Sequence, residues 1–251
     1  MRQQLLDPPP ENLDVASTDL ALLDHRIAAA HASGGTSDGF IYRMIARSIR
    51  NNDLRGSVLD FGAGKGDLTR LLLEAGRFSQ VAAADLMESP ADLKPSVRWM
   101  VADLNHPLPC ASESFDVIVA AEVIEHLENP RSVSRELFRL LRPGGSLILT
   151  TPNNESWRAL ISLIVRGHFV AFNDGSYPAH ITALLRTDLL RILTEVGFAA
   201  PAFDYSHHGG VPGLPIVAWQ SFSMGILRGL RFSDNLLALA RKPRREGVVS
   251  R

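Results

Sequence analysis

The pattern of apolar and polar positions changes at about residue 57. Before that point, apolar residues such as Leu20, Leu23 and Ile27 recur at helical spacing. The first stretch of the chain is polar and contains three consecutive prolines, which disfavour regular structure. The pattern therefore predicts an irregular stretch over 1–16, helices over 17–32 and about 40–51, and a glycine-containing loop over 33–39.

Beyond residue 57, short apolar runs alternate with stretches of helical periodicity. Such alternation is typical of a largely parallel sheet with helices on both faces. The predicted strands cover 58–61, 80–84, 97–101, 115–121, 146–151 and 236–240, and the predicted helices cover 67–75, 133–141, 154–165 and 186–196.

Length and composition set broad limits on the class of protein. A chain of 251 residues with 45% hydrophobic residues fits one α/β domain with additions. The net charge of −1 gives no reason to expect a nucleic-acid partner, and the one dense basic run, 241–245, is interpreted as a solvated tail. The single cysteine, Cys110, excludes an internal disulfide and a multi-cysteine zinc site. No signal peptide is visible, so we expect a cytoplasmic protein.

The first chemical signal is the run Asp60-Phe61-Gly62-Ala63-Gly64-Lys65-Gly66, where a strand passes into a helix. Its glycines permit positive φ angles and a close approach of a ligand to the backbone. A phosphate-binding P-loop would need Ser or Thr after Gly-Lys, and a dinucleotide fingerprint would need G-x-G-x-x-G. The acid before the glycines suits a ligand that carries an ammonium group. A purely structural glycine turn remains open at this point.

Two further acids follow predicted strands. Asp85 stands 23 residues after Gly62, where a carboxylate can accept both hydroxyls of a ribose. Asp103 ends the next strand and places an acceptor near the amino edge of an adenine. Either acid alone could cap a helix. The carboxyl ends of parallel strands meet at one edge, so the ordered set predicts a nucleoside-containing ligand there.

These motifs, together with F-D-V-I-V-A-A-E-V-I-E-H-L and L-F-R-L-L-R-P-G-G-S-L-I-L-T-T-P-N, resemble class I S-adenosylmethionine-dependent methyltransferases over residues 55–200. The closest likeness is to the subgroup with ubiquinone-pathway O-methyltransferases and sugar, lipid and natural-product methylating enzymes. The resemblance implies a doubly wound, seven-stranded, mostly parallel α/β sheet whose last strand is antiparallel, and S-adenosylmethionine as cofactor. It implies cofactor contacts from Asp60, Gly62, Ala63, Gly64 and Gly66 to the methionine part, from Asp85 and Leu86 around the ribose, from Asp103 and Leu104 to the adenine, and from Glu122 at the reactive end.

One departure from the family pattern is visible between Asp85 and Val97. Pro90 and Pro95 lie there, so the usual helix should be short or missing.

We expect a helical lid over 1–54 and a cofactor-binding domain over 55–251. Acceptor-side insertions are expected at about 153–185 and 207–232.

The sulfonium already activates the methyl group, so the protein needs a general base only for an acceptor that must lose a proton. The candidates for this catalytic role are His126, His180, Glu122 and Tyr177, although either histidine could simply fix a turn. His126 is expected at the start of a helix after the fourth strand. Glu122, Glu125, His126 and His180 also resemble the metal-binding arrangement of small-RNA 2′-O-methyltransferases. We expect no metal, because E-x-x-E-H also occurs in metal-free relatives and no basic RNA-binding face is evident.

The function predicted is methyl transfer from S-adenosylmethionine to oxygen of a small-molecule, lipid-linked or sugar-linked acceptor. The alternatives are metal-assisted RNA 2′-O-methylation, a nicotinamide-dependent oxidoreductase and a non-catalytic cofactor-binding protein. Residues 209–227 contain no charged residue. They are interpreted as a core-packing insertion, or as an apolar lid over the acceptor with possible peripheral membrane contact. The sequence offers no prediction of oligomeric state.

Overall fold

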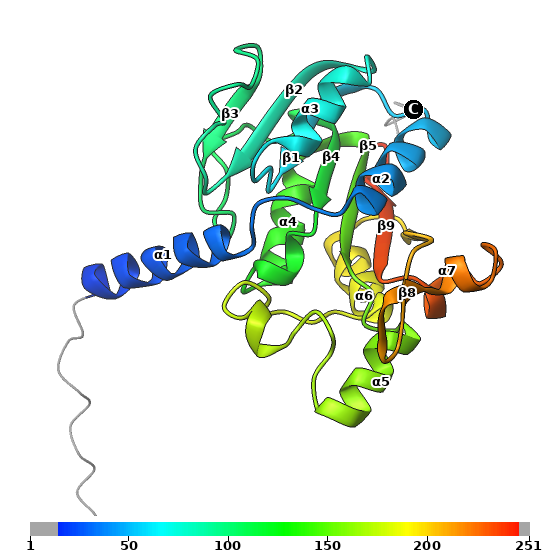
Figure 1. The fold of residues 1–251 in the computed structure, drawn as a ribbon. Helices are drawn as coiled ribbons and strands as arrows, with labels where there is room; N and C mark the ends of the chain where they lie inside the picture. The colour runs from blue at the N-terminus through cyan, green and yellow to red at the C-terminus, as the bar shows by residue number, and fades with distance from the viewer. Residues whose placement is uncertain (1–14, 246–251) are drawn as a thin grey trace, which may run out of the picture.

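The computed structural model describes residues 15–245 and contains one seven-stranded sheet and a two-stranded hairpin within that part of the chain. The strand order is β3-β2-β1-β4-β5-β9-β6, with every pair parallel except those of β9, which runs antiparallel to both neighbours (Figure 1). The predicted fold class is therefore confirmed. The strands are β1 (Gly56–Phe61), β2 (Phe78–Asp85), β3 (Arg98–Val101), β4 (Phe115–Ala121), β5 (Leu141–Pro152), β6 (Ala202–Tyr205) and β9 (Asn235–Arg241).

Helices cover both faces of this sheet, as the alternating pattern predicted. The helices are α1 (Val15–Ala32), α2 (Gly39–Asn51), α3 (Asp67–Glu74), α4 (Pro130–Leu140), α5 (Trp157–Arg166), α6 (Arg186–Val196) and α7 (Trp219–Phe222), with 3₁₀ turns η1 (Ile124–His126), η2 (Asp174–Ser176) and η3 (Leu230–Phe232). Alternate residues of β4 point to opposite faces. Val117 joins the apolar cluster formed with α2 and α3, while Ile118 joins the cluster formed with α4 and α6.

The N-terminal region does not behave as one lid. Helix α2 buries Ile41, Met44 and Ile45 against the sheet and belongs to the domain core. In α1, by contrast, no residue from 21 to 32 is buried, and Figure 1 shows this helix projecting from the side of the domain. The division expected at residue 54 therefore does not follow the packing, because the amphipathic face of α2 completes one layer of the fold. The expectation for residues 1–14 lies outside the described residues.

Two local predictions concern the segments after β2 and after β4: the first is confirmed and the second is wrong. No helix forms between β2 and β3, as the two prolines there predicted. His126 ends the short 3₁₀ turn η1 and does not begin a helix, since α4 starts only at Pro130, capped by the side chain of Asn129. The 207–232 insertion contains a hairpin of β7 (Gly210–Val211) and β8 (Leu214–Ala218), followed by α7. No described helix is long and apolar enough to cross a bilayer.

Candidate active site

The glycine turn after β1 is shaped by close backbone contacts. Gly62 and Ala63 donate their N–H groups to the carbonyl of Ala84, at 2.8 and 3.1 Å. Gly62 has φ +84°, and a Cβ there would collide with the side chain of Val123. A Cβ on Gly64 would instead meet the backbone carbonyl of Gly35, in the loop after α1. The glycines thus allow both the strand end and the N-terminal loop to approach the turn.

Asp60 and Gly66 support this turn from outside the cavity. The Asp60 carboxylate is fully buried and accepts a 2.6 Å hydrogen bond from the Thr69 hydroxyl, while its second oxygen has no protein partner. Burial raises the pKa of Asp60 to about 7. Gly66 caps the start of α3 with φ +78°. Neither residue lines the cavity, so the direct cofactor contacts expected of them are not what the geometry favours.

Asp85 and Asp103 stand at the ends of neighbouring strands, as expected. Each oxygen of Asp85 accepts one backbone hydrogen bond, from Gly64 at 2.7 Å and from Met87 at 2.8 Å. One oxygen of Asp103 accepts from the backbone N–H of Asn105 at 2.9 Å, and the other accepts from Arg26 at 2.6 Å. Carboxylate oxygens have further lone pairs, so both acids can still accept ligand hydroxyls or amines.

A cavity of about 470 Å³ runs between these strand ends, α1 and the segment before α6, within the size range typical of small-ligand sites. It brings together ten of the predicted site residues: Gly62, Ala63, Gly64, Asp85, Leu86, Asp103, Leu104, Glu122, His126 and His180. Helix α1 contributes residues that the sequence did not single out, Arg26 among them. Only the three-dimensional arrangement reveals it, because Arg26 meets Asp103 across 77 residues of chain.

Elsewhere in the cavity lining, the rings of His126 and His180 face each other edge to face, with centroids 4.8 Å apart. Each ring has its Nδ1 on a backbone carbonyl, of Ala179 at 2.8 Å and of Ala171 at 2.6 Å respectively. A carbonyl can only accept, so each Nδ1 carries the hydrogen and each Nε2 keeps its lone pair. Burial lowers the pKa of both rings, that of His126 to about 4, which keeps them neutral at neutral pH.

Two carboxylates lie beside these rings. Glu125 is fully buried; the Thr151 hydroxyl donates to one of its oxygens at 3.1 Å, and the other has no partner. Glu122 lines the cavity and accepts from Asn235 at 3.2 Å, again with one oxygen unpartnered. Burial raises the pKa of Glu122 to about 7 and that of Glu125 well above its ordinary value, with the charge of Glu122 adding to the second shift.

The backbone fixes this cluster across 55 residues of chain. The N–H groups of Ile181 and Thr182 both donate to the carbonyl of Glu125 at 2.9 Å, and the Thr182 hydroxyl donates to the carbonyl of Leu127 at 2.7 Å. His180 is therefore held opposite His126 by hydrogen bonds on both sides. The expected acceptor-side insertion at 153–185 reaches the cavity through this segment.

The second expected insertion, at 207–232, does not reach the cavity in the described part of its stretch 209–227. No described residue of 209–227 lines the cavity. The Gln220 side chain holds the insertion together by donating to the carbonyls of Leu227 and Phe232 and accepting from Gly209, so the structure corrects the expectation of a lid over the acceptor. Met224 and Ile226 remain exposed there, at 91% and 77%. Peripheral membrane contact stays a prediction.

Several known proteins resemble this chain in sequence. The sequence model of a family described as "Methyltransferase domain" matches residues 36–201. The chain is 36% identical to trans-aconitate 2-methyltransferase of Azoarcus sp. over 41% of each chain, and 30% identical to ubiquinone biosynthesis O-methyltransferase of Xanthomonas oryzae over 56% of this chain and 65% of that one. These matches span less than two thirds of the relatives' own length.

Solved structures share the fold. A 1,6-didemethyltoxoflavin-N1-methyltransferase of Burkholderia thailandensis, solved with bound 1,6-didemethyltoxoflavin and S-adenosylhomocysteine, superposes with a TM-score of 0.60 at 18% identity, over 95% of this chain and 93% of that one. The [4+2]-cyclase SpnF superposes with a TM-score of 0.54 at 18% identity, over 81% of each chain. At such identities the likeness concerns the fold alone.

Proposed function

The chain belongs to the class I S-adenosylmethionine-dependent methyltransferases, and we propose that it methylates a hydroxyl oxygen of a neutral, largely apolar small molecule. The family match contradicts a nicotinamide-dependent oxidoreductase. Supporting the cofactor assignment, Asp85 and Asp103 stand at neighbouring strand ends beside the glycine turn. In this proposal Asp85 accepts the ribose hydroxyls, Asp103 and Leu104 contact the adenine, and Leu86 packs beside the ribose. Gly62 to Gly64 contact the methionine part.

The charge of the cavity lining carries the proposal for the acceptor. Among its described residues, Arg26 has the one guanidinium or ammonium group, and that group is already paired with Asp103 and Glu128. A carboxylate or phosphate acceptor needs a free cation nearby to offset its desolvation. The remaining wall includes Leu22, Ile41 and other apolar side chains. A neutral acceptor fits this lining better than an anionic one.

The reaction then needs alignment and one proton transfer. A lone pair of the acceptor oxygen attacks the methyl carbon, the carbon–sulfur bond breaks with its electrons going to sulfur, and the hydroxyl proton leaves. The Nε2 lone pair of His126 or His180 supports a role as proton acceptor. Burial lowers the pKa of both rings and so weakens them as bases. Glu122 is the third candidate.

A second candidate mechanism is favoured by one observation. A Glu125 oxygen and one ring nitrogen each of His126 and His180 lie within 4.8 Å of one another. Histidines that bind metals commonly donate their other N–H to a backbone carbonyl, as both do here. A divalent cation bound by this set would promote loss of the acceptor proton to water by lowering the pKa of the hydroxyl. Two imidazoles favour Zn²⁺ or Mn²⁺ over Mg²⁺.

A metal titration of chelator-treated protein distinguishes the metal-free mechanism from the metal-assisted one. If a cation acts, Zn²⁺ or Mn²⁺ binds once per chain by calorimetry, His180→Ala weakens that binding at least about tenfold, and turnover needs the ion. His168→Ala is the matched control, since its Nδ1 also contacts a carbonyl, that of Phe169, but His168 lies outside the cluster. Full turnover in chelator with no bound ion would leave only the metal-free mechanism.

The acceptor class is tested with labelled S-adenosylmethionine and matched pairs of neutral alcohols or phenols and carboxylic acids. The proposal expects label in methyl ethers, which survive alkali, and loss of transfer in Asp85→Ala. Methyl esters, which alkali cleaves, would identify a carboxylate acceptor and overturn the proposal.

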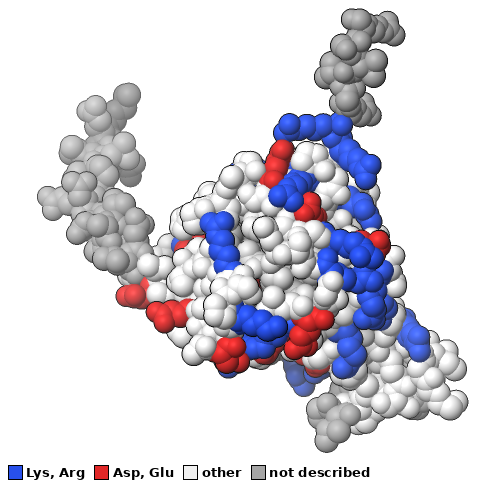
Figure 2. All heavy atoms as spheres, turned by 90° about the horizontal axis from the view of Figure 1, so that it is seen from above, with Lys and Arg blue, Asp and Glu red and all other residues white. Residues whose placement is uncertain are grey.

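Figure 2 shows Lys and Arg side chains gathered toward the right side of the face drawn. The expected lack of a nucleic-acid partner therefore stays a prediction, and an RNA oligonucleotide belongs in the panel.

A further inference from the structure

Helix α1 lies over the cavity with little packing to hold it. It contributes Leu22, Arg26 and Ala29 to the lining, yet no residue from 21 to 32 is buried. Its following loop is attached to the glycine turn, where Lys65 donates its backbone N–H to the Gly35 carbonyl at 2.8 Å. Residues 21–32 of the helix are thus tethered at their C-terminal end, and another contact is needed to hold the rest of this span in place.

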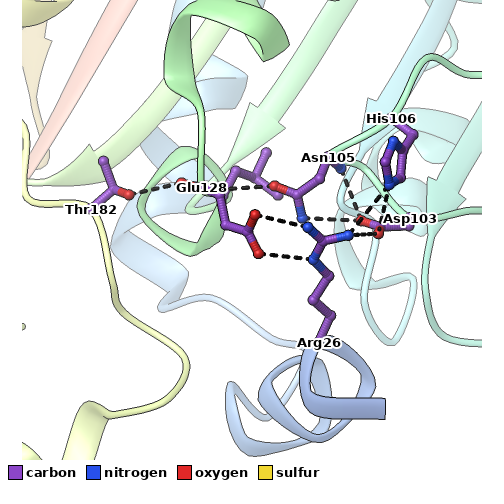
Figure 3. A network of polar contacts seen from close by, with 7 residues as sticks. Arg26, Asp103, Asn105, His106, Glu128 and Thr182 are labelled. Atoms are coloured by element: carbon purple, nitrogen blue, oxygen red, sulfur yellow. Dashed lines mark hydrogen bonds and ion pairs between the residues drawn. The ribbon is translucent and has the colours of Figure 1, made fainter. Parts of the chain in front are cut away.

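The side chain of Arg26 makes that contact. Its guanidinium binds Glu128 through two hydrogen bonds, of 3.0 and 2.8 Å, and binds Asp103 through a third, of 2.6 Å. Figure 3 shows the side chain rising from α1 between the two carboxylates. The side chain is only 15% exposed and that of Asp103 only 11%. The contact with Glu128 is two-pronged but reaches a carboxylate that is 46% exposed, whereas the single contact with Asp103 is largely covered. Two-pronged geometry and shielding from water each strengthen a guanidinium–carboxylate pair.

Asn105 connects the two segments that carry the receiving carboxylates. Asn105 donates its backbone and side-chain N–H groups to Asp103, at 2.9 and 3.0 Å, while its side-chain amide oxygen accepts the backbone N–H of Glu128 at 3.0 Å. One asparagine therefore fixes the strand end that carries Asp103 relative to the segment that carries Glu128. Two carboxylates held around one guanidinium would otherwise repel each other, so the arrangement favours a cation between them.

We propose that Arg26 is a positioning residue that latches α1 over the cofactor cavity and couples closure of this helix to the carboxylate that faces the adenine. Coupling to the cofactor rests on the proposed role of Asp103. The latch itself does not. When Arg26 leaves both acids, α1 pivots on the loop at Gly35 and the cofactor can enter or leave; when it returns, the cofactor is retained. Arg26 therefore acts on the rates of cofactor exchange more than on the chemical step.

Hydrogen exchange and cofactor chase experiments on the full chain test this role. In Arg26→Ala, exchange of the α1 amides should rise about tenfold or more while the α4 amides stay unchanged. Release of S-adenosylmethionine and its association should both accelerate severalfold, which a lost contact alone would not produce. Glu128→Gln should show the same signature more weakly, since it leaves Asp103 intact. The control is Arg131→Gln, which breaks the exposed pair with Glu195 outside the cavity.

The outcomes are distinct. Unchanged α1 exchange in both Arg26→Ala and Glu128→Gln would overturn the latch, whatever the cofactor does. Faster α1 exchange with cofactor release within twofold of wild type would overturn the coupling to the cofactor. Absence of binding to the wild-type chain would instead contradict the cofactor assignment. Neither variant alters a core residue, and thermal unfolding checks that each remains folded.

Discussion

The two ends of the cavity are built in different ways. Most of the cofactor end is formed by the stretch from Asp60 to Asn105. In this stretch, backbone N–H groups donate hydrogen bonds to the strand-end carboxylates. The opposite end combines the η1 turn with the segment around His180, which are distant in sequence and joined by hydrogen bonds to the Glu125 carbonyl. Local sequence therefore specifies cofactor binding, whereas acceptor chemistry depends on long-range hydrogen bonds.

The largest effect on cofactor binding should come from adding a side chain at Gly64 in the glycine turn. Gly64→Val places a side chain at φ +52° against the Gly35 carbonyl. It should abolish cofactor binding because the turn and the N-terminal loop can no longer pack. Gly76→Val is the matched control, also at positive φ (+63°) but with open space around its Cβ. Calorimetry on both folded variants decides, and retained affinity in Gly64→Val would show that the turn is not shaped for the ligand.

A smaller effect is expected at the opposite end. Either His126→Ala or His180→Ala, but not both, should lower turnover at saturating substrate by about a hundredfold, as for loss of a general base. Affinity for S-adenosylmethionine should not change, because the cofactor end is built separately. Equal losses in both variants would point to joint action of the rings, as in metal binding. Near wild-type rates in both variants would mean that neither histidine is the base. The enzyme would then use Glu122 as the base or work by alignment of the acceptor alone.

The smallest effect concerns stability without ligand. Burial raises the pKa of Asp60 to about 7 from the value near 4 of an unfolded carboxyl. The folded chain thus binds this proton more tightly, so the Asp60 contribution to stability is complete below pH 4 and is lost as pH rises to 7. Asp60→Asn should flatten the fall in Tm between pH 5 and 7.5, by a few degrees. Asp92→Asn, an exposed acid, is the control. An unchanged slope in Asp60→Asn would contradict a protonated Asp60.

Much of the cofactor end could be predicted from sequence, because glycine spacing and strand-end acids report local geometry. Arg26 could not. The apolar spacing predicted its helix through Leu23 and Ile27, but neither residue lines the cavity. The lining face carries Leu22, Arg26 and Ala29 instead. A weakly packed helix has no dominant apolar face, so its periodicity does not report which side meets the cavity; the contacts of Arg26 with Asp103 and Glu128 lie far along the chain.

The acceptor end shows the same limit. The E-x-x-E-H run identified Glu122, Glu125 and His126 as a candidate cluster, but two hydrogen bonds to the Glu125 carbonyl bring His180 to it. The charge-free stretch at 209–227 allowed a lid or a packed insertion. No described residue of this stretch lines the cavity, and Gln220 joins parts of the insertion to one another through hydrogen bonds that no periodicity in the sequence reports.

The central claim is that the strand-end acids beside the glycine turn bind S-adenosylmethionine, and calorimetry of Asp85→Ala tests it most directly. Charge-assisted hydrogen bonds contribute about 1.5–3 kcal/mol each, so losing the ribose acceptor should weaken binding at least about tenfold. Asp92→Ala, which removes an exposed acid paired with Arg70 outside the cavity, should bind as wild type does. A change smaller than twofold in a folded Asp85→Ala protein would contradict the account.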